Sequence, residues 1–227
     1  MTETRPPDAR RTPLTPHAVV EEALSLAESA GLGGVTIRRL AADLGVTPMA
    51  LYWHFRNKDE LLDGMVDGLY ARVNSAVDTS VTWPEQLRTL WSSLLGVLRD
   101  HPSSARLVAS RNPTSDSGLR VTETVLDILR RGGFTPAEAT QILRHAVSTL
   151  SHLVTTAPGA TSHAGGPEAE EGTRAALGSL PPESYPRLIE AAAPLSECQD
   201  PEAYFAFGLD LLLAGVEAMA DSRGERV

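Results

Sequence analysis

The sequence has almost no cysteine and no long uninterrupted apolar run. Cys198 is the single cysteine among 227 residues, so the chain can form neither an internal disulfide nor a metal site built from cysteines. No apolar run approaches the roughly 18 to 20 residues that span a bilayer, and the amino terminus lacks the apolar core of a secretory signal. We therefore expect a cytoplasmic protein with no membrane partner.

Signatures of catalysis are also missing. The sequence has no glycine-rich phosphate loop, no Gly-x-Ser-x-Gly elbow and no His-Glu-x-x-His pair, and Cys198 lacks the local context of a nucleophile. His145 and His152 lie seven positions apart on one expected helix, about 10 Å from each other, which is too far to share a metal ion. The sequence therefore predicts no enzyme, no cofactor and no metal site.

Acidic residues outnumber basic ones, but unevenly along the chain. The formal net charge is −9. Residues 1–58 hold seven Arg or Lys against six Asp or Glu, whereas residues 59–227 hold 13 against 23. Affinity for a polyanion would therefore have to come from individually placed basic side chains near the amino terminus, with Arg10 and Arg11 as candidates in the leading segment.

Signals for helix starts occur throughout the sequence. A capping residue precedes proline at Thr15, Thr47, Thr135 and Asp200, which is typical of helix starts. Apolar residues recur three and four positions apart without strand-like alternation, which predicts an all-α protein. The expected helices cover 16–30, 36–44, 48–55, 58–78, 83–100, 103–110, 117–131, 136–157, 183–194 and 201–221. We expect a disordered arm over residues 1–14 and a long loop over the small, polar and glycine-rich residues 158–172.

Residues 36–55 have the pattern of two short helices joined by a tight turn. Leu40 and Leu44 form an apolar stripe, Gly45 is expected in the left-handed conformation that ends the first helix, and Val46 fills the corner. This is the helix-turn-helix arrangement, whose second helix enters the major groove of DNA.

The second helix of this motif carries apolar side chains on two faces. Leu51 and Phe55 share one face and are expected in the core. The others spread over the opposite face and are predicted to be exposed, namely Met49, Ala50, Tyr52 and Trp53. Packing of the two aromatic rings on neighbouring helices is the alternative. The side chains that could reach phosphates are Arg38, Tyr52, His54, Arg56 and Lys58, and Arg38 or Arg39 could also make a forked contact with guanine.

From Leu14 to about Leu69 the chain resembles the DNA-binding region of the TetR family of bacterial transcriptional repressors, most specifically over Leu-Tyr-Trp-His-Phe-Arg-Asn-Lys at 51–58. The resemblance implies an all-α homodimer. Residues 15–60 would be a three-helix module that binds a palindromic operator on double-stranded DNA, and residues 61–227 a larger helical ligand-binding and dimerisation domain that holds a small-molecule inducer. The DNA-contacting residues that we predict are Thr36, Arg38, Thr47, Pro48, Met49, Ala50, Tyr52, Trp53, His54 and Lys58.

The carboxy-terminal half resembles the ligand-binding domain of tetracycline repressors, over Glu123–Phe134, the helix after it and Phe205–Val216. A histidine that in those proteins helps to hold drug-bound magnesium falls near Val108, and another pocket histidine falls near Asn74. Because an aliphatic side chain cannot ligate a metal, we do not expect magnesium-tetracycline as the inducer. Our candidate ligand-binding residues are Asn74, Val108, Ser110, Arg111, Asn112, Val125, His145 and Ser148.

Several interpretations remain open at this stage. The expected helix from Ala203 to Ala220 is apolar around most of its circumference, and either its own chain covers it or it forms a four-helix seam with helix 136–157 and a symmetry mate. The seam is favoured because a two-fold operator requires a two-fold protein. Gly64 and Gly68 are either closely packed or part of a hinge. A DNA-binding protein without an inducer is the alternative function.

Overall fold

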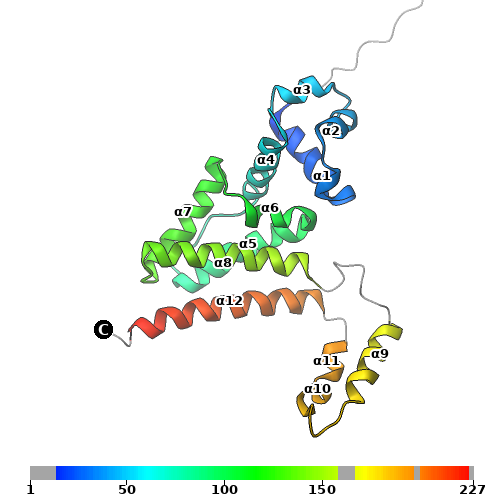
Figure 1. Cartoon of the computed structure of the whole chain (residues 1–227). Coiled ribbons are helices and arrows are strands. Elements are labelled where there is room, and N and C mark those ends of the chain that lie inside the picture. Colours follow the sequence, from blue (N-terminus) through cyan, green and yellow to red (C-terminus); the bar gives the residue numbers. More distant parts are fainter. Residues whose placement is uncertain (1–13, 158–166, 197–199, 225–227) are drawn as a thin grey trace, which may run out of the picture.

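The computed structural model describes residues 14–157, 167–196 and 200–224. Within these ranges the chain forms twelve α-helices, one 3₁₀ helix and no strand, so the all-α prediction is confirmed. The arm predicted over residues 1–14, with Arg10 and Arg11, lies outside the described residues except for Leu14. Figure 1 shows α1–α3 at one end of the molecule and α12 at the opposite side of the larger helical body.

The amino-terminal module consists of α1 (Pro16–Gly34), α2 (Ile37–Asp43) and α3 (Pro48–Tyr52). Each helix begins after a threonine whose hydroxyl oxygen accepts a hydrogen bond from a backbone amide in the first turn. The donor–acceptor distances are 3.1 Å at Thr15, 3.2 Å at Thr36 and 3.3 Å at Thr47. The predicted helix starts are therefore confirmed, although α3 is three residues shorter than predicted.

Two glycines in the left-handed conformation end helical segments of this module. Gly31 has φ 69° and interrupts α1, and Gly45 has φ 64° and follows α2. Such angles favour glycine because a Cβ atom would clash with the backbone. The predicted role of Gly45 is therefore confirmed.

Helix α4 (Lys58–Tyr70) connects this module to the larger body (Figure 1). A Cβ atom at Gly64 would lie 2.7 Å from Cε1 of Phe55, and one at Gly68 would lie 2.7 Å from Cγ1 of Val20. Both glycines are therefore sites of close packing, which was one of the two readings left open by the sequence. The prediction that this helix extends to residue 78 is wrong. The Asn74 side chain accepts a hydrogen bond from the Ala76 amide and so favours a turn there.

The larger body is built around α5, α7 and α8. It also includes α6 and α12, and a 3₁₀ turn at Pro102–Ser104 precedes α6. The bounds of these helices are α5 (Trp83–Asp100), α6 (Ala105–Ser110), α7 (Asp116–Arg131), α8 (Pro136–Thr155) and α12 (Pro201–Gly224). Trp91 and Phe134 are the largest fully buried side chains. One continuous apolar core joins this body to α1 and α4, so the amino-terminal module and the larger body are packed together.

The segment after α8 differs most from the sequence prediction. Residues 167–178, partly assigned to a long loop, form α9 (Pro167–Gly178), and the helix predicted over 183–194 is divided into α10 (Pro186–Glu190) and α11 (Ala192–Ser196). Pro167 at the start and the following Glu and Ala residues favour a helix more than the single Gly172 opposes it. The remainder of the predicted loop, residues 158–166, lies outside the described residues.

Helix α12 is apolar on two faces. Its buried face includes Phe205, Leu209, Leu213 and Val216, and its open face includes Phe207, Leu211 and Met219. Residues Pro201–Ser222 are long and apolar enough to cross a membrane by length and composition alone, which the search for uninterrupted apolar runs did not detect. One face packs on α5 and α8, but only 22% of the apolar window is buried.

Candidate nucleic-acid interface and ligand cavity

The outer surface of α3 carries apolar side chains that the protein itself does not cover. The exposed fractions are 85% for Trp53, 67% for Met49 and 47% for Tyr52, whereas Leu51 is fully buried. Ala50 is half-buried. The predicted division of this helix into a core face and an exposed face is therefore confirmed, and packing of the two aromatic rings inside the protein is excluded.

The other residues predicted to contact DNA lie close in sequence to this exposed surface. Thr36 and Thr47 each cap a helix through the hydroxyl oxygen, so each hydroxyl hydrogen is still available to a phosphate. Arg38 and Lys58 are exposed, Pro48 is exposed in the first turn of α3, and His54 is half-buried. The Lys58 ammonium group makes a long hydrogen bond of 3.5 Å to the Leu32 carbonyl. All these side chains can therefore be reached by a partner, although His54 is only partly exposed.

A cavity of about 480 Å³ lies between the end of α4, the α6–α7 segment and one face of α8. Five of the eight predicted ligand-binding residues line it, namely Val108, Ser110, Arg111, Asn112 and Ser148. Apolar side chains from α7 and α8 line the cavity together with hydroxyl groups, and the lining also includes Leu119, Thr122, Leu126, Thr140, Leu143 and Val147. Such a mixed lining suits an organic molecule with several polar groups.

The other three predicted ligand residues lie elsewhere. Asn74 is exposed after α4, and its backbone amide donates to Ser93 Oγ at 2.8 Å. Val125 is buried in the α7 core. His145 lines a different hollow, on the side of α8 that faces α12. The structure therefore does not bring these three residues to the cavity. Asn74 lies beyond the end of α4, and the faces of α7 and α8 that carry Val125 and His145 are not those that line the cavity.

Arg111 lies at the cavity and also holds the start of α4. Its Nη2 donates to Asp59 Oδ1 at 2.8 Å, and its Nη1 donates to Asp63 Oδ1 at 2.6 Å and to the Asp59 carbonyl at 3.2 Å. These hydrogen bonds, with Asp63 contributing most, raise the pKa of Arg111 above its ordinary value. One side chain thus connects the cavity to the first turns of the helix that follows the amino-terminal module.

A second contact joins the same loop to α4. The Asp67 carboxylate accepts hydrogen bonds from the Thr114 amide at 2.9 Å, the Thr114 hydroxyl at 2.8 Å and the Ser115 amide at 3.0 Å. Partial burial acts to raise the pKa of Asp67, but these hydrogen bonds outweigh it and hold the pKa below its ordinary value. Asp59, Asp63 and Asp67 are spaced four residues apart, so one face of α4 holds the whole 111–115 segment.

Tyr70 closes the α4 side of the cavity. Its side chain is buried, and this burial raises the pKa of its hydroxyl to about 12. The phenol is therefore neutral at physiological pH and can donate a hydrogen bond.

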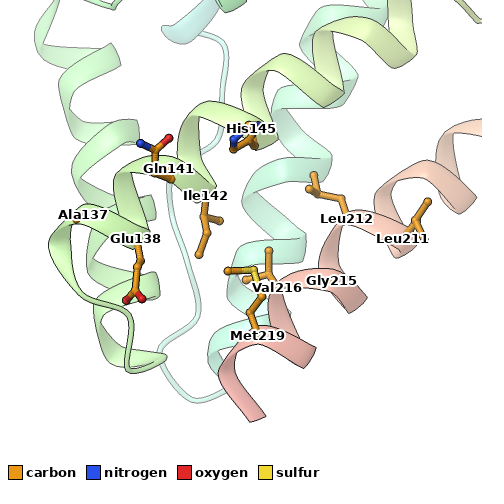
Figure 2. Close-up of a pocket in the computed structure, with 10 residues that line it drawn as sticks. All are labelled: Ala137, Glu138, Gln141, Ile142, His145, Leu211, Leu212, Gly215, Val216 and Met219. Atoms are coloured by element: carbon orange, nitrogen blue, oxygen red, sulfur yellow. The ribbon is translucent and has the colours of Figure 1, made fainter. Parts of the chain in front are cut away.

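A second hollow of about 630 Å³ lies between α8 and α12 and is open along the face of α12. Figure 2 shows Ile142 of α8 and Leu212 and Val216 of α12 directed toward the space between the helices. Phe207 and Leu211 on α12 are 71% and 65% exposed. A Cβ atom at Gly215 would meet nothing within 4 Å, whereas one at Gly208 would lie 2.7 Å from Leu153. The outer face of α12 is therefore uncovered.

Comparisons with protein families match both parts of the chain. Residues 19–65 match the model described as bacterial regulatory proteins, tetR family, and residues 78–220 match the model described as tetracyclin repressor-like, C-terminal domain. The chain belongs to the TetR family of bacterial transcriptional regulators. Members of this family are regulators and not enzymes.

Individual TetR relatives span nearly the whole chain. An HTH-type transcriptional regulator of Saccharopolyspora erythraea is 30% identical, with 95% of this chain and 91% of the relative covered. The class A tetracycline repressor of Escherichia coli is 29% identical, with 90% and 91% covered. The crystal structure of the TetR family protein ActR from Streptomyces coelicolor in complex with actinorhodin has a TM-score of 0.77 at 28% identity, with 92% and 99% covered.

Sequence reasoning missed several lining residues of this TetR-family cavity. Those with polar groups are Tyr70, Thr122, Thr140 and Arg144. A usable signal was present, because Leu119, Thr122 and Leu126 recur at helical spacing on α7 and form a stripe that mixes apolar and polar side chains. Such a stripe is typical of a cavity wall rather than of a dry core.

Proposed function

We propose that the protein is a homodimeric repressor that binds a palindromic operator and is released from it by a small organic ligand. The observation that carries the proposal is the 85% exposure of Trp53, directly after the short helix α3 at the end of the molecule. Binding of a partner that covers an exposed tryptophan ring is favourable, because it removes apolar surface from water. The proposed DNA surface comprises Thr36, Arg38, Thr47, Pro48, Met49, Ala50, Tyr52, Trp53, His54 and Lys58.

The open face of α12 supports the homodimer. Phe207, Leu211 and Met219 are spaced on one side of the helix, so two copies related by a two-fold axis would cover them together with the open side of α8. A two-fold pair also presents two copies of α3, which a palindromic operator requires. Residues 15–60 would then be the DNA-binding unit and 61–227 the ligand-binding and dimerising unit, acting in the cytoplasm, where bacterial DNA lies.

The cavity favours a ligand-released repressor over a DNA-binding protein without an inducer. Its volume of about 480 Å³ is within the range of small-molecule sites. One similar protein is described in complex with actinorhodin, and others are tetracycline repressors. We infer that the ligand of this protein is likewise a small organic molecule, bound by Val108, Ser110, Arg111, Asn112 and Ser148 among the predicted residues.

The direct test is binding to the DNA upstream of the gene, measured by gel shift and fluorescence anisotropy. We expect a complex of two protein chains per operator, and we expect Trp53→Ala to bind at least about tenfold more weakly while keeping its helical content. Leu188→Ala, which changes an exposed apolar side chain on α10, is the matched control. Equal operator affinity for Trp53→Ala and wild type would contradict the proposed DNA surface.

A further inference from the structure

The charged side chains that line the cavity differ from those of the protein as a whole. The chain has 29 Asp and Glu residues against 20 Arg and Lys. The cavity lining nevertheless includes Arg111 and Arg144 and, in the part of the chain that the structure describes, no Asp or Glu. Arg144 presents a positive charge with no described acidic partner to the cavity, whereas the charge of Arg111 is offset by Asp59 and Asp63, which accept its hydrogen bonds. The charged side chains of the cavity wall therefore indicate the charge of the ligand as well as its size.

We propose that the ligand is an amphipathic organic anion, such as a carboxylate or phenolate on a ring system, whose acidic group binds Arg111 and Arg144. This inference rests on the proposed function, because it takes the cavity between α4, α7 and α8 as the effector site. Arginine suits this role because its planar guanidinium group donates two parallel hydrogen bonds to an acidic group.

Arg144 is available to such an anion. It is exposed on α8 and makes no ion pair with any residue that the structure describes. Arg111 differs, because Asp59 and Asp63 on α4 already accept hydrogen bonds from both of its terminal nitrogen atoms. An anion in the cavity would therefore compete with these two carboxylates for Arg111.

This competition links the ligand to α4. Any anion that binds Arg111 in place of the aspartates weakens the contact between the 111–115 segment and the first turns of α4. Residues 53–57 alone separate α4 from α3. By thermodynamic linkage the reverse also holds, so the Asp59 and Asp63 carboxylates must lower the affinity for the anion. The proposal thus predicts opposite effects for substitutions of Arg111 and of its partners.

The rest of the wall fits the non-acidic part of such a ligand. Leu119, Leu126 and Leu143 provide apolar contacts. The hydroxyl groups of Thr122 and Thr140 donate to backbone carbonyl groups of their own helices at 3.0 and 2.8 Å, so their oxygen atoms remain free to accept hydrogen bonds from the ligand.

Two fluorescent probes with the same ring skeleton test the inference. Anilinonaphthalene sulfonate carries an anionic group, and phenylnaphthylamine lacks it. Titrated into the full-length protein, the sulfonate should bind at least about tenfold more tightly than the neutral probe, as expected for charge-assisted hydrogen bonds. Ser148→Trp, which fills the cavity, should remove this binding. Sulfonate binding that is unchanged in Ser148→Trp would contradict a cavity site.

Substitutions then separate the anion contact from general effects. Arg111→Gln and Arg144→Gln should each weaken sulfonate binding about tenfold and leave the neutral probe unaffected. Asp63→Asn should strengthen sulfonate binding severalfold, because it removes a competitor for Arg111. Arg120→Gln, on α7 but outside the lining, is the matched control. Arg144→Gln and Asp63→Asn keep the test valid if Arg111→Gln fails to fold.

The outcome also separates this inference from the proposed function. Equal affinity for both probes in the wild type, or weaker sulfonate binding by Asp63→Asn, would overturn the anionic ligand class even if the protein binds operator DNA. The absence of any specific complex with upstream DNA would instead contradict the proposed function. Release of operator DNA by the sulfonate, but not by the neutral probe, would support both.

Discussion

Trp53 is more exposed than any other large apolar side chain in the described part of the chain. It follows a five-residue helix in which Leu51 is fully buried. The same short segment is therefore held to the core by Leu51 and exposes Trp53 to solvent. Anchoring by the core holds the backbone that carries the exposed rings in place before a partner binds. A rigid, pre-positioned aromatic side chain loses little conformational entropy on binding.

Arg38 and Lys58 should contribute to DNA affinity in different ways. Arg38 is exposed on α2 and, among the described residues, has no acidic partner, so its guanidinium group can form a forked contact with a guanine. We expect Arg38→Ala to cost on the order of 1–3 kcal/mol of binding free energy and to relax selectivity at one base pair. Lys58→Ala should weaken binding to all sequences alike. Competition binding with a library of singly substituted operators measures both, and an equal loss on operator and random DNA for Arg38→Ala would contradict base contact.

Asp67 should make stability depend on pH in the acidic range. Its pKa is lower in the folded protein than in the unfolded chain because of the hydrogen bonds from Thr114 and Ser115. Its contribution is therefore complete above the unfolded pKa of about 3.9 and is lost as the pH falls through the lower folded pKa. We expect Asp67→Asn to be destabilised relative to wild type near pH 7 and this difference to shrink below about pH 4.

Urea unfolding at a series of pH values tests this expectation. Asp127→Asn is a suitable control, because its carboxylate pairs with Arg131 on the surface at 3.0 Å and should change the free energy of unfolding less. A difference between Asp67→Asn and wild type that stays constant from pH 7 to pH 3 would contradict the role of this carboxylate.

The candidate site could be predicted only in part at the residue scale. Exposure of Trp53 and burial of Leu51 follow from the angle between successive residues of a helix, which is a local property. The placement of Val108 near a cavity came from the resemblance to tetracycline repressors, whereas Arg111 was predicted only as a possible polar group of the pocket. Arg144 was missed because its position at the cavity depends on how α8 packs against α6 and α7, which no local pattern encodes.

Among the helices, α4 is the element that every part of the proposed mechanism shares. Its Gly64 and Gly68 allow close contact with the amino-terminal module, and its aspartates hold the 111–115 segment. If a helix packed this tightly on both sides moves as a unit, we expect a displacement at the cavity to reach α1 and α3.

Adding a methyl group to α4 should loosen this packing. A Cβ atom at Gly68 would lie 2.7 Å from Val20, and one at Gly64 would lie 2.7 Å from the Phe55 ring. We expect Gly68→Ala and Gly64→Ala each to lower the free energy of unfolding by about 1–3 kcal/mol. Gly64→Ala should also weaken operator binding, because Phe55 follows α3 directly.

Gly96→Ala is the matched control for these substitutions. Gly96 lies within α5, and a Cβ atom there would meet nothing within 4 Å. The change should stabilise the protein by roughly 0.5–1 kcal/mol, because alanine loses less conformational entropy than glycine in a helix. Thermal and urea unfolding measure all three variants. Gly68→Ala with wild-type stability and wild-type induction would remove both the packing role and a hinge role.

Helix starts were easier to predict than helix ends. Thr15, Thr47 and Thr135 cap their helices through their own side chains, so each start depends on adjacent residues alone. The end of α4 at Tyr70 instead depends on the turn made by Asn74 and on the Ser93 hydroxyl, which belongs to α5. Contacts between helices therefore determine where α4 ends, and such contacts could not be predicted from the local sequence.

At the scale of the whole molecule, α12 is the helix that we propose as the interface between two copies. Its inner face is held by packing on α5 and α8, by the Arg88–Asp210 ion pair at 2.5 Å and by Arg99, whose guanidinium group lies 4.4 Å from the centre of the Phe205 ring. The helix is therefore anchored to its own chain with Phe207 and Leu211 still exposed. An anchored helix with a free apolar face is suited to an interface between two copies.

A charge on that free face should separate the two chains. Leu211 is 65% exposed, so Leu211→Glu disturbs no core contact of a single chain but places a carboxylate in the proposed interface, where burial of an unpaired charge is costly. We expect a monomer at micromolar concentration by analytical ultracentrifugation, with native helical content, and a loss of operator affinity of at least about a hundredfold. Val81→Glu, which charges an exposed apolar site before α5, should remain dimeric. If the Leu211→Glu variant is dimeric and binds the operator with wild-type affinity, the interface between the two copies lies elsewhere. A different arrangement of the dimer would then have to place the two copies of α3 in successive major grooves.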